Sequence, residues 1–401
     1  MRKMALALML TALPLQAAYA EVGQRFPSEK REIVDPITKA TLTVLTSNPG
    51  GDSKIYQTHP QWTSDGRHII FRSSKRAADG NGQAFAVEQA TGTIIQLTEG
   101  PGVNIGTLNV ARRSNKLYYL RTQDGRTRLI ELDLDKLFAD SAAGKVTKGG
   151  YEREMALLPA DYRDSGGFTL DADEKTAYLG VVLEDPPPRP QGGPVPQVPS
   201  GIRAVDLQTG EYRKVIDVPF RMGHVQANPF VPGEIIYCQE TGGDAPQRMH
   251  VVKADGTGNR PLFPEAPTDW VTHEVVVDAD HVMFNLMGHT PELRQRPTGI
   301  MVINLRDGSV QNLGQNEGRG FWHSDGTPDG RWAVGDDFDG TITLIDRKTG
   351  ARTVLSSGHF MRPDHTHPNF SPDGKHILIQ SGMLSQGKKL DLMLVPIPAT
   401  R

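Results

Sequence analysis

Two histidines, His365 and His367, stand one residue apart near the C-terminal end of the chain. In an extended segment, residues i and i+2 point to the same face, so both imidazoles could address one point in space. Neutral imidazole is a good ligand for Mn, Fe, Zn and similar divalent ions. Together with His323, the pair forms a candidate set of three metal ligands, which Asp364, Asp325 or water could complete. A hydrogen-bonded turn is the alternative interpretation of the pair.

The histidines gather at one position of a recurring pattern. Six of the 12 histidines precede a turn that leads into an apolar strand: His59, His224, His273, His323, His365 and His367. Scattered surface histidines have no reason to be distributed in this way, so we expect these residues to converge on one site. Capping of the turn, or packing against it, is the alternative for any single member.

The recurring pattern is a tight turn followed by an apolar strand. Ser-Pro-Asp-Gly at residues 371–374 is the clearest turn, because Pro presets φ and Gly supplies conformational freedom. Similar units occupy residues 61–71, 110–120, 168–181, 229–238, 275–284, 326–334 and 369–379. Hairpins closed by a Thr-Gly turn recur between them, at residues 90–98, 206–211 and 346–351. Seven repeats of two hairpins predict an all-β fold, a seven-bladed β-propeller.

The two ends of the chain predict how the ring closes. Residues 35–46 look like an outer hairpin without an inner partner, and residues 367–397 look like inner strands without a following hairpin. Pairing of these N-terminal and C-terminal strands would close the ring and remove exposed sheet edges. We therefore expect residues 21–401 to form a single propeller domain. An open sandwich is the alternative, and the Pro/Gly-rich residues 185–200 are expected to form an extended loop.

The N-terminus has the pattern of an export signal. Arg2 and Lys3 precede an apolar run at residues 4–15, and Ala18-Tyr19-Ala20 is a small-x-small cleavage site. We predict a signal peptide at residues 1–20 and a periplasmic or secreted mature chain. The apolar run is shorter than the roughly 20 residues that a membrane span needs, so no membrane span is predicted.

Composition excludes several other classes of protein. The net charge of −3 and the lack of a basic cluster argue against a nucleic-acid partner. The single cysteine, Cys238, lies in an apolar strand pattern and is expected to be a buried, inert thiol. The acidic residues 336–339 are expected to form a solvated loop. Oligomeric state is not indicated by the sequence.

Several segments resemble the oligogalacturonate lyases, polysaccharide lyase family 22. Residues 362–368 resemble that family's Gln-x-x-His-x-His-Pro metal segment, with Arg in place of Gln. Residues 322–324 look like its Ser-His segment, and residues 272–274 match its Thr-His-Glu segment. Residues 244–250 resemble an Asp-Ala-Arg-Met-Trp segment with two residues inserted, and residues 56–66 resemble the family's early Tyr-x-x-x-x-Trp-Thr-x-Asp-Gly region.

The resemblance implies a function and assigns roles. It implies a seven-bladed lyase that cleaves 4-linked uronic acid oligosaccharides, such as oligogalacturonate, by β-elimination to 4,5-unsaturated products. His323, His365 and His367 would bind a divalent metal, with Mn²⁺ as the expected ion. His273 would be the catalytic base, and Arg248 would hold the substrate carboxylate or stabilise the charge that develops on it.

The remaining candidates are substrate contacts, and other interpretations stay open. Tyr56, His59, His224 and Arg362 are candidate contacts for an acidic oligosaccharide. Arg362 cannot ligate a cation, which leaves the fourth metal ligand to Asp364 or water. A surface ion pair is the alternative for Arg248. For the whole chain, the alternative is a non-catalytic TolB-like periplasmic propeller that binds a protein partner.

Overall fold

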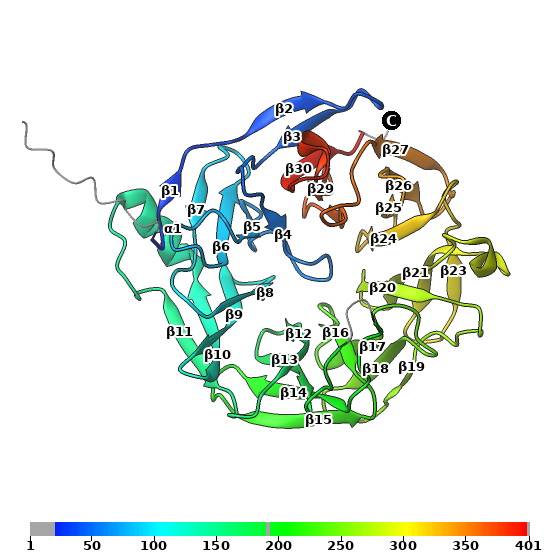
Figure 1. The fold of residues 1–401 in the computed structure, drawn as a ribbon, viewed down its shortest axis with the longest axis horizontal. Coiled ribbons are helices and arrows are strands. Elements are labelled where there is room, and N and C mark those ends of the chain that lie inside the picture. Colours follow the sequence, from blue (N-terminus) through cyan, green and yellow to red (C-terminus); the bar gives the residue numbers. More distant parts are fainter. Residues whose placement is uncertain (1–20, 190–192, 399–401) are drawn as a thin grey trace, which may run out of the picture.

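Seven antiparallel sheets surround a central channel in the computed structural model (Figure 1). The structure describes residues 21–189 and 193–398. The predicted all-β, seven-bladed propeller is confirmed. The signal peptide predicted for residues 1–20 lies outside the described residues. None of the helices in the described part of the chain has the length and apolarity needed to cross a bilayer.

Blades 1 to 3 come from the first half of the chain. Blade 1 consists of β4 (Ser53–Lys54), β5 (His68–Ser73), β6 (Gln83–Glu88) and β7 (Ile94–Gln96), with β1 (Arg25–Phe26) as a fifth, outer strand. Blade 2 consists of β8 (Val103–Val110), β9 (Lys116–Gln123), β10 (Arg126–Asp133) and β11 (Glu152–Leu157). Blade 3 consists of β12 (Asp164–Leu170), β13 (Thr176–Val182), β14 (Ser200–Asp206) and β15 (Tyr212–Val218).

Blades 4 to 6 repeat the four-stranded unit without additions. Blade 4 consists of β16 (Met222–Ala227), β17 (Glu234–Gln239), β18 (Met249–Lys253) and β19 (Arg260–Pro261). Blade 5 consists of β20 (Val271–Val276), β21 (His281–Leu286), β22 (Gly299–Asn304) and β23 (Val310–Asn312). Blade 6 consists of β24 (Phe321–Gly326), β25 (Trp332–Asp337), β26 (Ile342–Asp346) and β27 (Arg352–Ser356).

Blade 7 joins the two ends of the chain, as predicted. Its inner strands are β28 (Asn369–Phe370), β29 (His376–Ser381) and β30 (Asp391–Pro396), and its outer strands are β3 (Thr41–Val44) and β2 (Arg31–Val34). Antiparallel pairing of Thr43 with Leu394 and of Val44 with Met393 closes the ring. An open sandwich is therefore excluded.

Helical structure is sparse. The helix α1 (Leu134–Ala143) follows β10. Asp133 caps its first turn by accepting a hydrogen bond from the backbone N–H of Lys136, and Gly144 ends it in the left-handed conformation, with φ of 66°. The described residues also contain two short 3-10 turns, η1 (Pro291–Arg294) and η2 (Met383–Ser385).

Apolar contacts between adjacent blades form the core. Ile236 and Met249 of blade 4, for example, belong to one buried cluster with Val282 and Phe284 of blade 5. Full burial of a side chain of this size contributes roughly 1.5–3 kcal/mol. Each blade packs one face of its sheet against each of its two neighbours. The ring is therefore stable only when it is complete.

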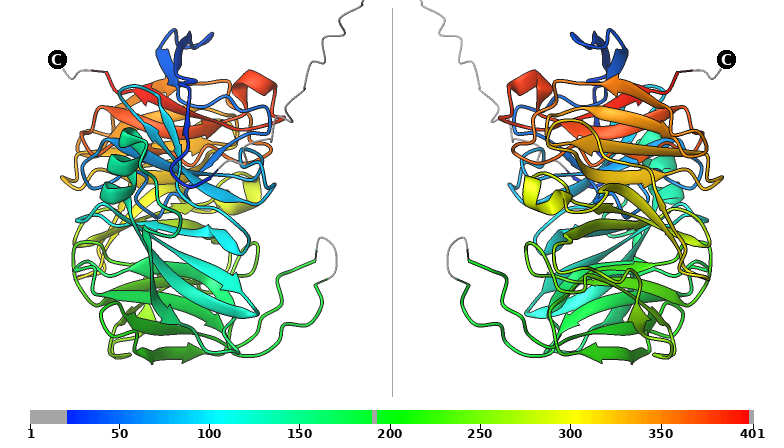
Figure 2. Two further views of the ribbon diagram at one scale, coloured as in Figure 1. Left: turned by 90° about the vertical axis from the view of Figure 1, so that its left-hand side faces the viewer. Right: turned by 90° about the vertical axis from the view of Figure 1, so that its right-hand side faces the viewer.

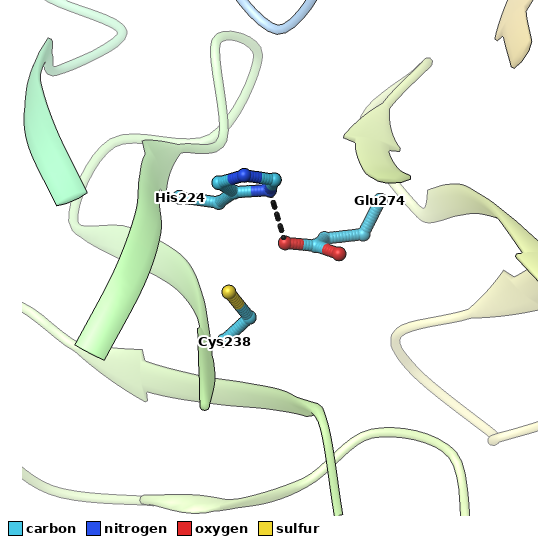
Figure 3. A group of neighbouring side chains, drawn as sticks. All are labelled: His224, Cys238 and Glu274. Carbon is cyan, nitrogen blue, oxygen red and sulfur yellow. Dashed lines mark hydrogen bonds and ion pairs between the residues drawn. The ribbon is translucent and has the colours of Figure 1, made fainter. Parts of the chain in front are cut away.

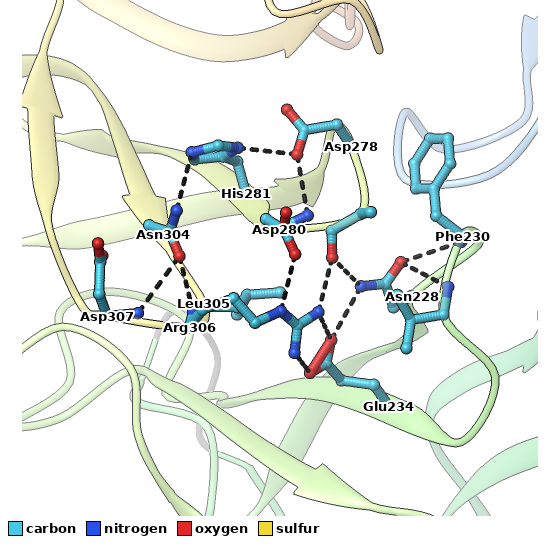
Figure 4. A network of polar contacts seen from close by, with 12 residues as sticks. Asn228, Phe230, Glu234, Asp278, Asp280, His281, Asn304, Leu305, Arg306 and Asp307 are labelled. Atoms are coloured by element: carbon cyan, nitrogen blue, oxygen red, sulfur yellow. Dashed lines mark hydrogen bonds and ion pairs between the residues drawn. The ribbon is translucent and has the colours of Figure 1, made fainter.

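A polar network also joins blades 4 and 5 at their turns (Figure 4). The guanidinium of Arg306 donates to Glu234 at 2.7 and 2.9 Å and to Asp280 at 2.8 Å. Asn228 donates to the same carboxylate of Glu234. Arg306 is partly exposed, so we attribute to this network mainly the alignment of the two blades.

One face of the ring carries the connections between the second and third strands of the blades. Figure 2 shows η1, η2 and the described arms of the connection after β13 on the same side of the disc. This connection includes the predicted loop at residues 185–200, of which residues 190–192 lie outside the described part. The first strand of each blade begins on this same face, because it is antiparallel to the second.

Candidate active site and metal centre

Three histidines share a left-handed backbone conformation, two of them within inner strands and one in the loop before β28. His224, His273 and His367 have φ values of 45°, 57° and 48°. In β16 and β20 the pairing register shifts at the histidine, as in a β-bulge. Bulges beside active sites re-aim a side chain, and His is several-fold enriched among non-Gly residues with positive φ. The shared position of these histidines in the repeat therefore has a backbone cause.

The structure brings the three predicted metal ligands together. The ring centroids of His323 and His367 lie 4.1 Å apart, those of His323 and His365 5.3 Å apart, and those of His365 and His367 6.1 Å apart. The prediction that His365 and His367 lie in an extended segment is wrong. These residues precede β28 in a loop, and His367 has positive φ.

A buried carboxylate orients this cluster. Both oxygens of Asp336 lie 3.2 Å from Nδ1 of His323, and Asp336 also accepts hydrogen bonds from the Thr366 hydroxyl at 2.5 Å and the His367 backbone N–H at 3.3 Å. A carboxylate only accepts, so Nδ1 of His323 carries the proton and Nε2 carries the lone pair. Metal-binding histidines commonly have such a carboxylate partner.

The donor types of this cluster suit a divalent cation, although no three of its donor atoms lie within 4.8 Å of one another. Nδ1 of both His365 and His367 is buried and has no hydrogen-bond partner among the described residues. A buried, unpaired nitrogen is costly, and a cation would remove that cost. Asp364 adds an oxygen donor, since its Oδ1 lies 3.3 Å from Nε2 of His367. Burial alone would raise the pKa of Asp364, but hydrogen bonds from His367 and Gln380 hold that pKa below its usual range.

His273 lies directly beside the metal cluster. Its ring centroid is 4.1 Å from that of His323, and its Nδ1 lies 2.5 Å from the backbone carbonyl of Trp322. A carbonyl oxygen only accepts, so Nδ1 is protonated and Nε2 keeps the lone pair. Burial, together with the proximity of His323 and the positive charge of Arg248, lowers the pKa of His273 well below its ordinary value. The imidazole is therefore neutral and in the tautomer that a base requires.

Arg248 lies in a buried ion-pair cluster with Glu274 and Glu240. Its Nε lies 3.3 Å from Oε2 of Glu274, and its Nη2 lies 3.5 Å from Oε2 of Glu240. His224 contacts the second oxygen of Glu274 through Nδ1 at 3.0 Å. The surface ion pair considered for Arg248 is thus wrong, because the side chains of Arg248 and Glu274 are 4% and 0% exposed.

The four predicted substrate contacts do not all lie together. Tyr56 and His224 belong to the site, since the Tyr56 ring centroid lies 5.2 Å from that of His224 and 5.3 Å from that of His367. His59 bonds through its ring nitrogens to Thr58 and to the carbonyl of Phe168. It lines a cavity of about 590 Å³ that extends to the Ser-Pro-Asp-Gly turns on the opposite face. Arg362 is exposed and belongs to neither group.

Sequence reasoning missed three charged residues around the site. The acidic residues 336–339, expected to form a solvated loop, include the fully buried Asp336 at the end of β25. Glu274 was given no role of its own. Lys54 is 1% exposed, donates to Asn369 at 2.5 Å, and has a pKa that burial lowers to about 7. Asp336 directly continues the strand pattern of β25, and a charged residue in such a position could have indicated that Asp336 is buried.

Relatives of the chain are found by sequence. It is 22% identical over 379 residues to an oligogalacturonate lyase of Dickeya dadantii, which covers 86% of this chain and 91% of that one. It is also 22% identical over 391 residues to an oligogalacturonide lyase of Pectobacterium atrosepticum, covering 90% and 94% of the two chains. No family model matches the chain.

Solved structures share the fold over nearly the whole chain. An oligogalacturonate lyase in complex with manganese superposes with a TM-score of 0.77 at 23% identity, covering 94% of this chain and 99% of that one. An oligogalacturonate lyase from Vibrio parahaemolyticus superposes equally well at 19% identity, with the same coverage.

These matches show that the chain has the seven-bladed propeller fold of the solved oligogalacturonate lyases. Over most of its length, its sequence is also similar to oligogalacturonate lyases, the family that its motifs resemble.

Proposed function

We propose that this chain is a metal-dependent lyase that cleaves 4-linked uronic acid oligosaccharides, of the oligogalacturonate type, by β-elimination. The observation that carries the proposal is the position of His273. It is a neutral imidazole with a fixed tautomer, it lies beside the three-histidine cluster, and it is within the electrostatic reach of Arg248. A base next to two sources of positive charge suits proton abstraction beside a carboxylate.

His323, His365 and His367 would hold the cation, with Asp364 or water as a further ligand. The donor set of imidazole nitrogens and one carboxylate suits Mn²⁺, the ion bound in one structural relative. When bound, the cation supplies positive charge that neutralises the uronate carboxylate and makes the neighbouring C–H group more acidic.

The residues of the chain account for the remaining chemistry. Nε2 of His273 takes the proton from C5 of the sugar, the electron pair forms the C4–C5 double bond, and the bond from C4 to the glycosidic oxygen breaks. The departing oxygen takes up a proton. Arg248 uses two N–H groups on Glu274 and Glu240, so its other N–H groups are available to the substrate carboxylate. Tyr56 and His224 border the position of the sugar.

An absorbance assay tests the proposal. Protein loaded with Mn²⁺ should convert oligogalacturonate to a product with ultraviolet absorbance from the conjugated double bond. Chelation of the metal and His273→Ala should each abolish that signal. New reducing ends without absorbance would indicate hydrolysis and would refute the lyase mechanism. Other uronic acid polymers, assayed in parallel, define the substrate.

The metal content of the same preparation tests the alternative function, a non-catalytic TolB-like scaffold. Such a propeller has no need of a tightly bound divalent ion, so a metal content near zero after purification in Mn²⁺-containing buffer would favour the scaffold. We further propose that the chain is exported, because residues 1–20 have the pattern of a signal peptide. Mature protein that begins at Glu21 in the periplasm or medium would support export.

A further inference from the structure

A second cluster of potential ligands lies beside the three histidines. Donor atoms of His224, Cys238 and Glu274 all lie within 4.8 Å of one another, and the three side chains point toward a common centre (Figure 3). In the described part of the chain, this is the group of His, Cys, Asp and Glu residues that meets that spacing. The residues come from β16, β17 and β20, so the cluster bridges blades 4 and 5.

We propose that His224, Cys238 and Glu274 form a second metal site, which takes a thiophilic divalent ion such as Zn²⁺ or Cd²⁺. A thiolate selects these ions over Mn²⁺, which prefers oxygen and imidazole ligands. Zinc is commonly held by a mixture of thiolate, imidazole and carboxylate. Three protein ligands leave a fourth position open, as in zinc sites that exchange a bound water. The two clusters are thus suited to different ions.

Charge balance permits a cation here although Arg248 is adjacent. Binding releases the thiol proton to solvent, so the thiolate of Cys238 and the carboxylate of Glu274 together neutralise the dication. Arg248 contacts Glu274 through the other oxygen, Oε2, and keeps Glu240 as a second anionic partner. The cluster then contains no unbalanced buried charge, which is the usual obstacle to a buried ion.

An ion has a route to the cluster. Cys238 and Glu274 are fully buried, but the side chain of His224 is 22% exposed. The His224 ring also contacts the Tyr56 ring, with centroids 5.2 Å apart. An ion would therefore enter from the channel, past His224.

Occupancy of this site should oppose catalysis, an expectation that rests on the proposed function. Glu274 would then contact both the ion and Arg248. The ion would also compete with Arg248 and the Mn²⁺ site for the substrate carboxylate. We expect Zn²⁺ to inhibit the Mn²⁺-loaded protein. Cys238→Ala should retain the activity and lose the inhibition, because Cys238 has no part in the proposed reaction.

The binding test does not depend on activity. Cys238 is the only cysteine of the chain, so ultraviolet thiolate-to-metal charge transfer during a Cd²⁺ titration reports on this site alone. We expect one equivalent of Cd²⁺ to produce the band in the wild type and none in Cys238→Ala. His224→Gln should weaken Cd²⁺ binding at least about tenfold, as loss of a ligand does. His365→Ala should keep the Cd²⁺ band and lose affinity for Mn²⁺.

Three results would overturn the proposal. One is the absence of the band in the wild type. The second is a Cd²⁺ affinity that His224→Gln leaves unchanged, which would reduce the site to a lone thiol. The third is loss of Mn²⁺ binding in Cys238→Ala, which would mean that the two clusters share one ion. If the binding results hold but no lyase activity is found, only the proposed function fails.

Discussion

The carboxylate of Asp336 contacts the His323 ring nitrogen with both oxygens at 3.2 Å and also accepts the backbone N–H of His367. Asp336 belongs to β25 of blade 6, whereas His367 precedes the first strand of blade 7. A single buried anion therefore sets both the tautomer of one candidate ligand and the backbone position of another. The geometry of this candidate metal centre depends on the contact between two blades.

Asp336→Asn should weaken Mn²⁺ binding. The amide can no longer stabilise protonated Nδ1 of His323 with both of its polar atoms, and losses of this kind cost about 10–100-fold in metal affinity. Titration of Mn²⁺ followed by electron paramagnetic resonance measures the change. Asp339→Asn is the matched control, because Asp339 lies in the same acidic stretch but pairs with Arg319 at the surface. Equal affinity in the wild type and Asp336→Asn would contradict the role of Asp336.

His273→Gln should lower kcat by about 10²–10⁴-fold, the range for loss of a general base, without loss of Mn²⁺. Glutamine can still donate a hydrogen bond to the carbonyl of Trp322, so the local structure should survive. Steady-state formation of the unsaturated product provides the rate, and bound Mn²⁺ provides the control. A variant with wild-type kcat would remove His273 as the base.

The pH profile of the wild type tests the same residue. Burial and neighbouring positive charge depress the pKa of His273, so the imidazole stays unprotonated until the pH falls well below 6.5. A base works in its unprotonated form, and therefore the acid limb of kcat/KM should lie below pH 6.5. An acid limb at or above 6.5 that disappears in His273→Gln would show that the pKa is not depressed.

Arg248→Ala should destabilise the fold as well as abolish activity. It leaves Glu274 buried without its cationic partner, a change that costs about 3–5 kcal/mol in comparable buried pairs. The double variant Arg248→Ala/Glu274→Gln removes the unpaired charge, so it should recover part of the stability and none of the activity. Urea denaturation and the absorbance assay separate the two effects.

Removal of an exposed arginine serves as the control for this series. Arg319→Ala breaks a surface pair with Asp339 and should change the free energy of unfolding by less than about 1 kcal/mol. If Arg248→Ala is no more destabilising than Arg319→Ala, the buried ion pair does not stabilise the fold.

Lys54→Met should change how stability depends on pH. Burial lowers the pKa of Lys54 from 10.5 to about 7 in the folded state, so between these values the unfolded chain binds the additional proton. Stability attributable to Lys54 therefore rises as the pH increases from 7 toward 10.5, and it is lost as the pH falls back through 7. The shift corresponds to an effect on the order of 4 kcal/mol.

Urea denaturation of wild type and Lys54→Met between pH 7 and pH 10 measures this effect. The difference in unfolding free energy should move in favour of the wild type as the pH rises. Lys388→Met, at an exposed lysine, should show no such trend. A constant difference between wild type and Lys54→Met would mean that Lys54 remains charged in the folded protein.

The fold could be predicted because short segments of the sequence specify its hairpins. The Ser-Pro-Asp-Gly turn at residues 371–374 specifies a hairpin by its own chemistry, and seven related turns imply seven blades. The helix α1 could have been found from Asp133 and Gly144, which have the residue types of an N-cap and a C-cap.

The site was only partly predictable, because its geometry depends on contacts between blades. The repeat position placed His273 and His323 in the channel, but nothing in the sequence indicates that Asp336 would lie under His323 and His367. The left-handed backbone of His367 likewise depends on the surrounding loop, and it replaces the extended geometry inferred from the sequence. Burial of Lys54 and Glu274 follows from ring closure rather than from any local pattern.

Closure of the ring through β3 and β30 has a consequence for the order of assembly. Blade 7, which bears His365 and His367, needs strands from both ends of the chain, with Thr43 paired to Leu394. Contacts so distant in sequence form late, since a long loop must close before they contribute stability. Under the proposed function, the cation would be captured only by a chain that has been synthesised and folded to its end, and tight metal uptake would be a signal that the last blade has docked.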